Sequence, residues 1–439
     1  MKKYTYLFIG LITGLHFTAC DSYLDIEPQG KVIPETLEEN RGLITVAYNG
    51  FPTHKSRLTF RADELVLDEF SIDAAYYRDI YIWKDVNPDS QTAAYPWVQF
   101  YNTIFYTNYI INEGQKTIED SADKNQLVGE AYALRAYAYF DLVNLYGNPY
   151  DEATADSDKA VPLALEIDLE QVFTPVSVAQ VYEQVLADID RAKASLVLET
   201  QETGMNYRFS LSAVNALEAR VNLYSNHWEK ALQAAEKALS YNNSLVNLNT
   251  DPQLPNRYDS PESVLALEDV YEYEVNNAAY VSEMLTDRYD KDNDLRFGLY
   301  FVQAGSRYKS GKGGAQQFKC SIRTSELYLI KAEALMELGR IEESRSVLLA
   351  LLRNRYRTAY IPALENSVKA LDNNGYATLL MEERARELAL EGHRWFDLRR
   401  TNQKEIRHTF NGDVYTLQAN DPRYTLLYPQ EAKLNNPEL

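Results

Sequence analysis

The sequence of 439 residues is poor in cysteine, glycine, proline and positive charge, and each scarcity excludes a class of protein. Two cysteines cannot form the disulfide framework of a small secreted scaffold. With 18 glycines and 15 prolines, the chain is neither collagen-like nor of low complexity. Lys and Arg number 44 against 64 Asp and Glu, so the formal charge is −20. Because nucleic-acid binding requires a basic surface, we expect no nucleic-acid partner.

Aromatic side chains, above all tyrosine, are in excess. The chain contains 34 Tyr, 15 Phe and 4 Trp, which make up 12% of its residues, within a hydrophobic fraction of 45%. That fraction is enough to bury a large core. Tyrosine combines an apolar ring with a polar hydroxyl, a combination that suits hydrated recognition surfaces. The composition therefore predicts a globular protein with an aromatic binding surface.

The N-terminus has the pattern of a secretory signal that ends at a cysteine. A basic start precedes an apolar run over residues 4–17, which is too short to span a membrane as a helix. Small residues then lead to Cys20, an arrangement that resembles the bacterial lipoprotein box. We expect residues 1–19 to be a lipoprotein signal peptide and Cys20 to be acylated; the alternative is a plain signal peptide with an incidental cysteine. Cys320 then lacks a partner and is expected to be a buried free thiol.

Beyond this leader, most of the chain has the periodicity of amphipathic helices, and strand patterns are few and short. Ala131, Leu134, Ala138 and Leu142, for example, recur at steps of three and four residues and so share one helix face. The predicted helices cover residues 36–51, 95–113, 124–146, 177–197, 210–226, 228–241, 323–338, 340–355 and 376–400. This pattern predicts a mostly α fold.

Two helical stretches repeat one another at a distance of 113 residues. The shift superposes Ala219 on Ala332, and each copy contains a helix with small residues, a break and a second helix. The breaks fall at Asn226 and Gly339. Such hairpins are typical of tetratricopeptide repeats, in which small residues permit close helix approach. We therefore expect a tetratricopeptide-like helical-repeat scaffold.

Long segments without this periodicity separate the scaffold helices, at residues 52–94, 147–176 and 242–322. Loops of this length in a compact protein are usually functional. Dense aromatic clusters occur in two of them, at residues 70–83 and 271–280. We expect these segments to form an irregular, loop-rich ligand-binding region.

The patterns that carry catalysis or metal binding are incomplete. The five histidines include no i, i+4 pair for a helix-borne zinc site, and no G-x-S-x-G nucleophile motif occurs. Asp290, Asp292 and Asp294 alternate like the start of a calcium loop, but Leu295 occupies the position that needs glycine. We expect no catalytic residue, no metal and no cofactor; a bound calcium ion is the alternative to a solvated acidic turn at these aspartates.

Near the C-terminus, Glu383, Glu387 and Glu391 recur at i, i+4 among arginines and precede Gly392 and Trp395. A charged ladder of this kind usually serves structural pairing rather than acid–base catalysis. We therefore expect these residues to stabilise the fold.

The most specific strings in the chain resemble landmarks of the SusD/RagB family, the surface nutrient-binding lipoproteins of Bacteroidetes. They are CDSYLDIEP from residue 20, GEAYALRAYAYFDLVNLYGNPY from residue 129, IRTSELYLIKAEALMELG from residue 322 and ERARELALEGHRWFDLRR from residue 383. These strings occur in the family's order along almost the whole chain. The resemblance implies a single SusD-like domain over residues 20–439, tethered by lipid to the outer membrane and facing the cell exterior.

The resemblance also implies a function. Members of the family bind oligosaccharides, or peptides in the RagB branch, and dock as a lid on a TonB-dependent transporter of the SusC type without catalysing a reaction. For this chain the resemblance implies capture of oligosaccharide nutrients and their delivery to such a transporter. A peptide-binding lid and a helical-repeat scaffold for protein interaction stay open as alternatives.

We expect the ligand site where residues 70–83 face residues 271–280, because the resemblance implies that loops from these regions converge. The rings expected to stack on the ligand are Tyr76, Tyr77, Tyr81, Trp83, Tyr271, Tyr273 and Tyr280. Arg78 and Asn276 are expected to supply hydrogen bonds. The alternative is that most of these rings belong to the core or to the transporter interface.

Overall fold

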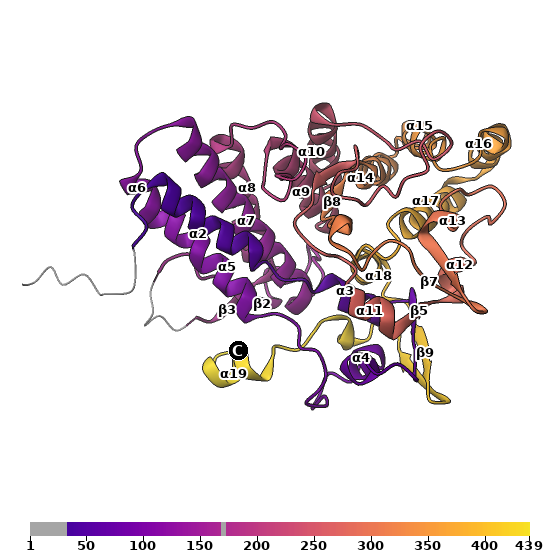
Figure 1. Cartoon of the computed structure of the whole chain (residues 1–439), viewed down its shortest axis with the longest axis horizontal. Helices are drawn as coiled ribbons and strands as arrows, with labels where there is room; N and C mark the ends of the chain where they lie inside the picture. The colour runs from indigo at the N-terminus through magenta and orange to yellow at the C-terminus, as the bar shows by residue number, and fades with distance from the viewer. Residues whose placement is uncertain (1–32, 168–172) are drawn as a thin grey trace, which may run out of the picture. The chain divides into compact units, whose positions relative to one another are not determined.

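Serine side chains mark where three of the longest helices begin. Ser121, Ser177 and Ser210 each accept a backbone N–H in the first turn, which satisfies a donor that a helix start leaves unpaired. These caps open α7 (Ala122–Tyr146), α8 (Val178–Ser195) and α9 (Leu211–Tyr224). The computed structural model describes residues 33–167 and 173–439, and helices predominate in this part of the chain (Figure 1). The predicted mostly α fold is confirmed.

The remaining helices of eight residues or more are α2 (Leu37–Asn49), α4 (Ala74–Tyr81), α5 (Val98–Tyr109), α10 (Trp228–Tyr241), α14 (Thr324–Glu337), α15 (Ile341–Leu352), α16 (Ile361–Ala370), α17 (Asn373–Glu387) and α18 (Arg394–Thr401). The shorter ones are α3 (Lys55–Leu58), α6 (Gln115–Thr117), α11 (Tyr273–Ala278), α12 (Glu283–Thr286), α13 (Phe297–Tyr300) and α19 (Gln430–Asn435). A π-helical turn, Ile110–Gly114, follows α5.

The repeated segments form two helical hairpins, α9 with α10 and α14 with α15. Their turns contain the predicted breaks, Asn226 at φ 59° and Gly339 at φ 76°, a left-handed conformation that ends each first helix. Ala219 and Ala332 are fully buried in their helices. Because α10 also packs on α14, the hairpins are neighbours, and Figure 1 shows the pairs following one another from α7 and α8 to α14 and α15. The assignment of these hairpins to the tetratricopeptide class stays a prediction.

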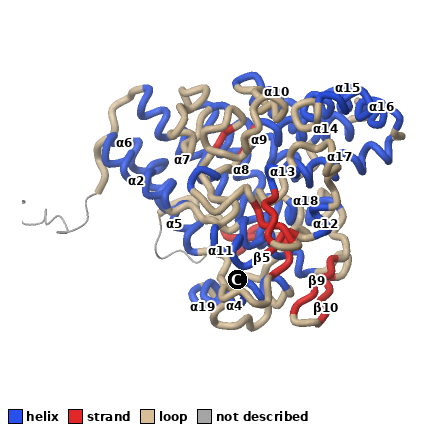
Figure 2. The backbone as a smooth tube through the Cα atoms, turned by 45° about the vertical axis from the view of Figure 1, so that its right-hand side comes forward, coloured by secondary structure: helices blue, strands red, loops and turns tan. Residues whose placement is uncertain are grey.

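Strands in the described chain are short and occur in antiparallel pairs, which Figure 2 shows as small red segments among loops. The pairs are β1 (Leu65–Leu67) with β5 (Ala279–Val281), β2 (Lys159–Pro162) with β3 (Pro175–Ser177), β4 (Ser263–Leu265) with β8 (Ile322–Arg323), β6 (Phe301–Ala304) with β7 (Arg307–Ser310), and β9 (Ile406–Phe410) with β10 (Asp413–Leu417). The register of β1 and β5 sets Val66 opposite Tyr280. This pairing brings the segments 52–94 and 242–322 together.

Three clusters of buried apolar side chains form the core. One packs α2, α5 and the helices from α7 to α10, and another packs the helices from α14 to α17. The third contains Phe60, Tyr77, Tyr81 and Tyr271 and so joins the two aromatic segments. The predicted convergence of residues 70–83 and 271–280 is therefore confirmed, as a shared core cluster.

The helix predicted over residues 376–400 is wrong as a single element. α17 ends at Glu387, and Leu390 and Gly392 then adopt φ 60° and 76° before α18 begins. A Cβ atom on Gly392 would lie 2.5 Å from Cβ of Lys55, so close packing with a distant segment requires glycine here. The sequence analysis also missed α16.

The aromatic segments are not simple loops. Residues 74–81 form α4, and residues 273–278 form α11. Thr36–Leu439 form one compact unit, to which all these elements belong. The predicted signal peptide and Cys20 lie outside the described residues, whereas Cys320 is a buried free thiol, as predicted. Among the described residues, no helix has the length and apolar character needed to cross a membrane.

Candidate ligand-binding site

A buried network of arginines and glutamates anchors the segment around the candidate site to the C-terminal helices. Arg323 donates to Glu391 from Nε at 2.8 Å and from Nη2 at 2.9 Å. Arg296 and Arg355 both donate to Glu387, at 2.8 Å and 2.9 Å. The structural role predicted for the glutamate ladder is confirmed, but these partners come from other elements rather than from the same helix.

Three of the rings predicted to stack on ligand are core residues instead. Trp83 and Tyr271 are each 1% exposed, and Tyr77 stacks on Phe60 with ring centroids 4.8 Å apart. Because protein atoms cover their faces, these rings present no free stacking surface. The physical reason is that burying a large aromatic body stabilises the small cluster that joins the two segments.

Tyr81 is also buried, and the ring of His408 covers one of its faces. The His408 ring stacks on Tyr81 at 4.1 Å and on Trp83 at 4.2 Å, with interplanar angles of 7° and 18°. Both imidazole nitrogens of His408 lie against backbone carbonyls, of Tyr81 and of Ala62. The face of Tyr81 is therefore occupied, and the expectation that it stacks on ligand is corrected to a supporting role.

The two polar side chains predicted to contact ligand are already engaged. Asn276 donates to the carbonyl of Ser310 at 3.1 Å and accepts from its N–H at 3.1 Å, which pins β7 to α11. Arg78 donates to the buried carboxylate of Asp79 at 2.8 Å. Asn276 is thus a structural residue, and Arg78 is mainly one.

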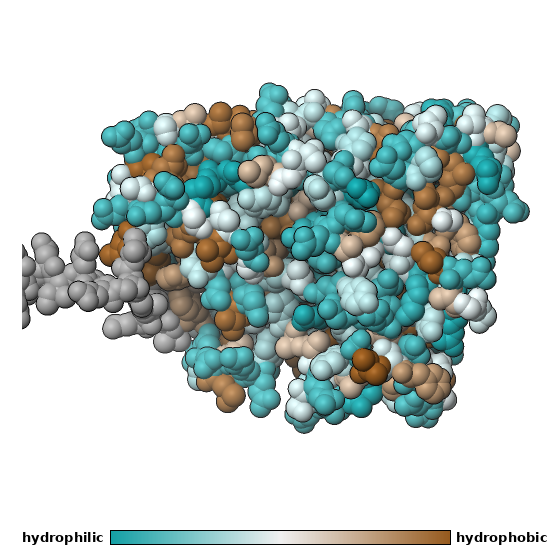
Figure 3. Space-filling model, viewed as in Figure 1, coloured by the Kyte–Doolittle hydropathy of each residue, from teal (hydrophilic) through white to brown (hydrophobic). Residues whose placement is uncertain are grey.

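The other nominated rings reach the surface. Tyr76 on α4 and Tyr273 on α11 are 49% and 59% exposed, and Tyr280 on β5 is partly exposed. Figure 3 shows that apolar side chains on the viewed face gather in small patches separated by hydrophilic ones. The ligand contacts of Tyr76 and Tyr273 stay predictions.

A cleft of about 320 Å³ lies beside Tyr280. We name it the Tyr280 cleft; its lining includes Tyr81, Tyr280, Met284, Arg307, Arg407 and His408. The residues of the lining come from α4, the β1–β5 pair, α12, β7 and β9. Two nominated tyrosines therefore line one cavity, with an exposed apolar side chain at Met284 and two exposed arginines.

Positive charge lies over the Tyr280 ring. The guanidinium carbon of Arg307 is 4.8 Å from the ring centroid, and Nζ of Lys309 is 4.4 Å from it. Alternate residues of a strand share a face, so β7 directs both side chains toward the same ring. Cation–π attraction fixes the ring and the two cations relative to one another.

Asp63 is an acidic residue of the cleft lining. Burial would raise the pKa of its carboxyl group, but Arg394, Lys404 and Arg288 hold that pKa well below its usual range. Arg394 donates to both carboxylate oxygens at 2.7 Å. Asp63 is therefore an ionised, fully paired structural residue.

A larger cleft, of about 750 Å³, lies elsewhere and contains none of the nominated residues. The arginines of this cleft already have partners: Arg399 donates to the carbonyl of Tyr424, and Arg400 donates to the carboxylate of Glu333. We assign the candidate site to the smaller Tyr280 cleft, because a nominated and partly exposed ring meets the free guanidinium of Arg307 there.

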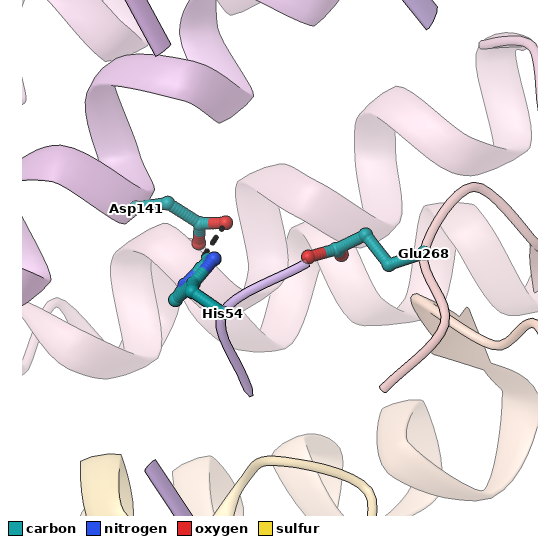
Figure 4. Close-up of side chains that lie close together, drawn as sticks. All are labelled: His54, Asp141 and Glu268. Atoms are coloured by element: carbon teal, nitrogen blue, oxygen red, sulfur yellow. Dashed lines mark ion pairs between the residues drawn. The ribbon is translucent and has the colours of Figure 1, made fainter. Parts of the chain in front are cut away.

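One group of buried side chains has the composition of a metal site. His54, Asp141 and Glu268 offer ligand atoms within 4.8 Å of one another, and Figure 4 shows His54 directed toward Asp141. The ammonium of Lys55 already lies there, 3.3 Å from Asp141 and 2.7 Å from Glu268. Burial, followed by the charge of Lys55, lowers the pKa of His54 to about 3. Lys55 supplies the positive charge that a metal would bring, so these residues do not fit a metal ion.

Met284, Arg307, Lys309 and Arg407 were not predicted from the sequence as residues of the site. The only available signal was the alternation of Arg307 and Lys309 in a short polar strand, which does not reveal what ring they face. The pairing of β1 with β5, which places Tyr280 at the cleft, depends on contacts distant in sequence.

Comparison with known proteins gives consistent matches along the chain. A family model described as starch-binding and associating with the outer membrane matches residues 22–223, and the model of the SusD family matches residues 198–438. The SusD-like protein P38 of Formosa agariphila is 26% identical, over 94% of this chain and 95% of that protein.

Solved structures share the fold. A SusD superfamily protein from Bacteroides thetaiotaomicron superposes with a TM-score of 0.77 at 22% identity, covering 92% of this chain and 98% of that one. A laminarin-binding SusD-like protein has a TM-score of 0.63 at 20% identity, covering 83% and 91% of the respective chains.

Proposed function

The chain belongs to the SusD family, and on that premise we propose that it captures oligosaccharides at the cell surface and delivers them to a TonB-dependent transporter of the SusC type. The observation that carries this proposal is the Tyr280 cleft, where a partly exposed ring meets exposed arginines. Ligand sites commonly combine an apolar face with a few placed polar groups. An aromatic face packs on a sugar ring, and guanidinium donors bond sugar hydroxyls.

The comparisons support glycans as the ligand class. One matching family model is described as starch-binding, and one structural neighbour is described as laminarin-binding. These words describe those proteins and not this chain. They make starch and laminarin oligosaccharides the first ligands to test.

A calorimetric screen of the protein against oligosaccharides and peptides tests the proposal. We expect saturable binding of at least one oligosaccharide, with no product released on prolonged incubation, because the protein binds without catalysing a reaction. Binding of peptides and of no oligosaccharide would instead support the peptide-binding lid. Hydrolysis of a bound oligosaccharide would contradict the absence of catalysis.

Anchoring through Cys20 is the second part of the proposal. Stable membrane attachment by lipid requires more than one acyl chain, which a fully acylated N-terminal cysteine carries. Cys20→Ala should move the protein from the outer-membrane fraction to the soluble fraction in cells that lack the transporter. Retention of this variant on those membranes would contradict lipid anchoring.

Partnership with a transporter is the third part. Detergent extraction of the acylated protein from its native membrane, followed by affinity purification, should recover an outer-membrane protein of the TonB-dependent class in a fixed ratio. Recovery of the acylated protein alone under several mild detergents would contradict a stable complex.

A further inference from the structure

We propose that the ligand of the Tyr280 cleft is an acidic glycan, one whose sugar units carry carboxylate or sulfate groups. This inference rests on the proposed function, because it takes oligosaccharide binding as given and names the class of oligosaccharide. It arises from the charges that the cleft presents, in a chain whose formal charge is −20.

Two cations over the Tyr280 ring, of which Arg307 lines the cleft, lack a carboxylate partner. Within residues 33–167 and 173–439, neither Arg307 nor Lys309 forms an ion pair, although both lie over the Tyr280 ring. Lys309 donates to the carbonyl oxygens of Asn276 and Asn277, at 2.8 Å and 3.0 Å. Arg307 is exposed and keeps its guanidinium donors available to a ligand.

This situation differs from that of the buried arginines. Arg296 and Arg323, for example, are fully buried and each contacts several carboxylates. Because acidic residues outnumber basic ones, the surface as a whole repels anions. A free guanidinium beside an aromatic ring at a cleft therefore favours an anionic group on the ligand. Guanidinium in particular matches the planar geometry of carboxylate and sulfate oxygens.

The acidic residues of the lining do not cancel this charge. Asp63 is neutralised by three cations, Arg288, Arg394 and Lys404. Glu283 is an exposed carboxylate at the start of α12. Arg407 is paired with Glu405 at 2.7 Å, on the exposed side of β9. Arg307 is thus the cation of the lining whose donors are free, and the anionic group of the ligand is expected there.

The decisive experiment compares matched glycans that differ only in charge. Three pairs serve as probes: oligogalacturonates with their methyl esters, a sulfated galactan oligosaccharide with its desulfated form, and a glucuronate-containing oligosaccharide with its carboxyl-reduced form. Calorimetry on the full mature chain should show the acidic member of at least one pair binding about 10-fold or more tightly than its neutral partner, since charge-assisted hydrogen bonds are the stronger kind. This preference should weaken as salt is raised, because salt screens exposed charges.

Substitutions of Arg307 test whether this residue causes the preference for the acidic glycan. Arg307→Gln should weaken binding of the acidic probe about 10-fold and that of the neutral probe much less, since a neutral hydroxyl loses only an uncharged hydrogen-bond acceptor contact, while Arg307→Lys should retain a preference for the acidic member. Arg191→Gln, which removes an exposed cation on α8, is the matched control and should change neither affinity. Because Arg307 is exposed, its replacement leaves the fold intact.

Equal affinity for acidic and neutral members, or preference for the neutral ones, would overturn the inference while leaving the proposed function in place. Binding of peptides with no oligosaccharide of either charge would overturn both. An acidic preference that survives Arg307→Gln and Lys309→Gln together would overturn the assignment to this cleft.

Discussion

Arg323 donates two parallel hydrogen bonds to Glu391, from Nε to Oε2 at 2.8 Å and from Nη2 to Oε1 at 2.9 Å. Both side chains are almost completely buried. Lys312, in the glycine-rich stretch after β7, also forms an ion pair with this carboxylate. Burial would raise the pKa of Glu391, but Arg323 and Lys312 lower it, so the carboxylate is ionised. This relationship ties β8 and the glycine-rich stretch after β7 to the turn between α17 and α18.

Removing the charge of Glu391 should therefore destabilise the protein strongly. Glu391→Gln leaves Arg323 and Lys312 buried beside a neutral amide, and breaking a buried pair in this way costs about 3–5 kcal/mol. Urea unfolding followed by circular dichroism measures the change. Glu343→Gln is the matched control: it removes an exposed partner of Arg340 and should leave stability almost unchanged, because solvent screens an exposed pair. Similar losses for both variants would contradict a structural role of the buried network.

Trp83 should support the fold rather than contact the ligand. Its indole Nε1 donates to the carbonyl of Arg61 at 3.1 Å, and its ring packs on His408. Trp83→Phe keeps most of the packing but leaves that carbonyl unpaired, which should cost about 1–3 kcal/mol. Thermal unfolding should show a lower Tm, and calorimetry an unchanged dissociation constant for the glycan. An unchanged Tm together with lost glycan binding would show that Trp83 contacts the ligand.

His54 should make the protein less stable in acid. Its pKa is about 3 in the folded protein against an ordinary 6.5, so between these values the unfolded chain binds a proton that the folded chain does not. The free energy of unfolding therefore falls as the pH decreases from 6.5 to 3, by up to about 1.4 kcal/mol per pH unit from this residue.

The variant His54→Leu isolates this contribution. Among the described residues, neither ring nitrogen of His54 makes a hydrogen bond of normal length, and Nε2 lies 3.6 Å from Oδ2 of Asp141. Leucine therefore removes no strong hydrogen bond and should leave stability at pH 7 unchanged or higher. The stability advantage of the variant over the parent should grow on acidification, measured by urea unfolding at pH 7, 5 and 4. A difference that does not vary with pH would show that His54 already carries its proton in the folded protein.

The helical scaffold was readable from the sequence because its signals are local. Apolar spacing located the major helices, and Asn226 and Gly339 marked the hairpin turns in which the structure places them. The break between α17 and α18 was not readable, because it depends on Gly392 packing against Lys55, more than three hundred residues away in the chain.

The candidate site was readable only in part. Aromatic density identified the two segments that converge, but it did not distinguish the buried ring of Tyr271 from the partly exposed ring of Tyr280. That distinction follows from the β1–β5 register and from the core that these segments form together. The unpaired state of Arg307 was also unreadable, since pairing is decided by the distribution of carboxylates in space.

Calorimetry on Tyr280→Ala, with the oligosaccharide that binds the parent most tightly, shows whether glycans are captured at the Tyr280 cleft. Tyr258→Ala, which removes an exposed ring outside the Tyr280 cleft, is the control. Loss of one stacking ring should weaken binding by about 1–3 kcal/mol, a range measured for aromatic stacking on nucleic-acid bases, while the control should bind like the parent. Parent-like affinity of Tyr280→Ala, with the fold intact by circular dichroism, would contradict this location of the site.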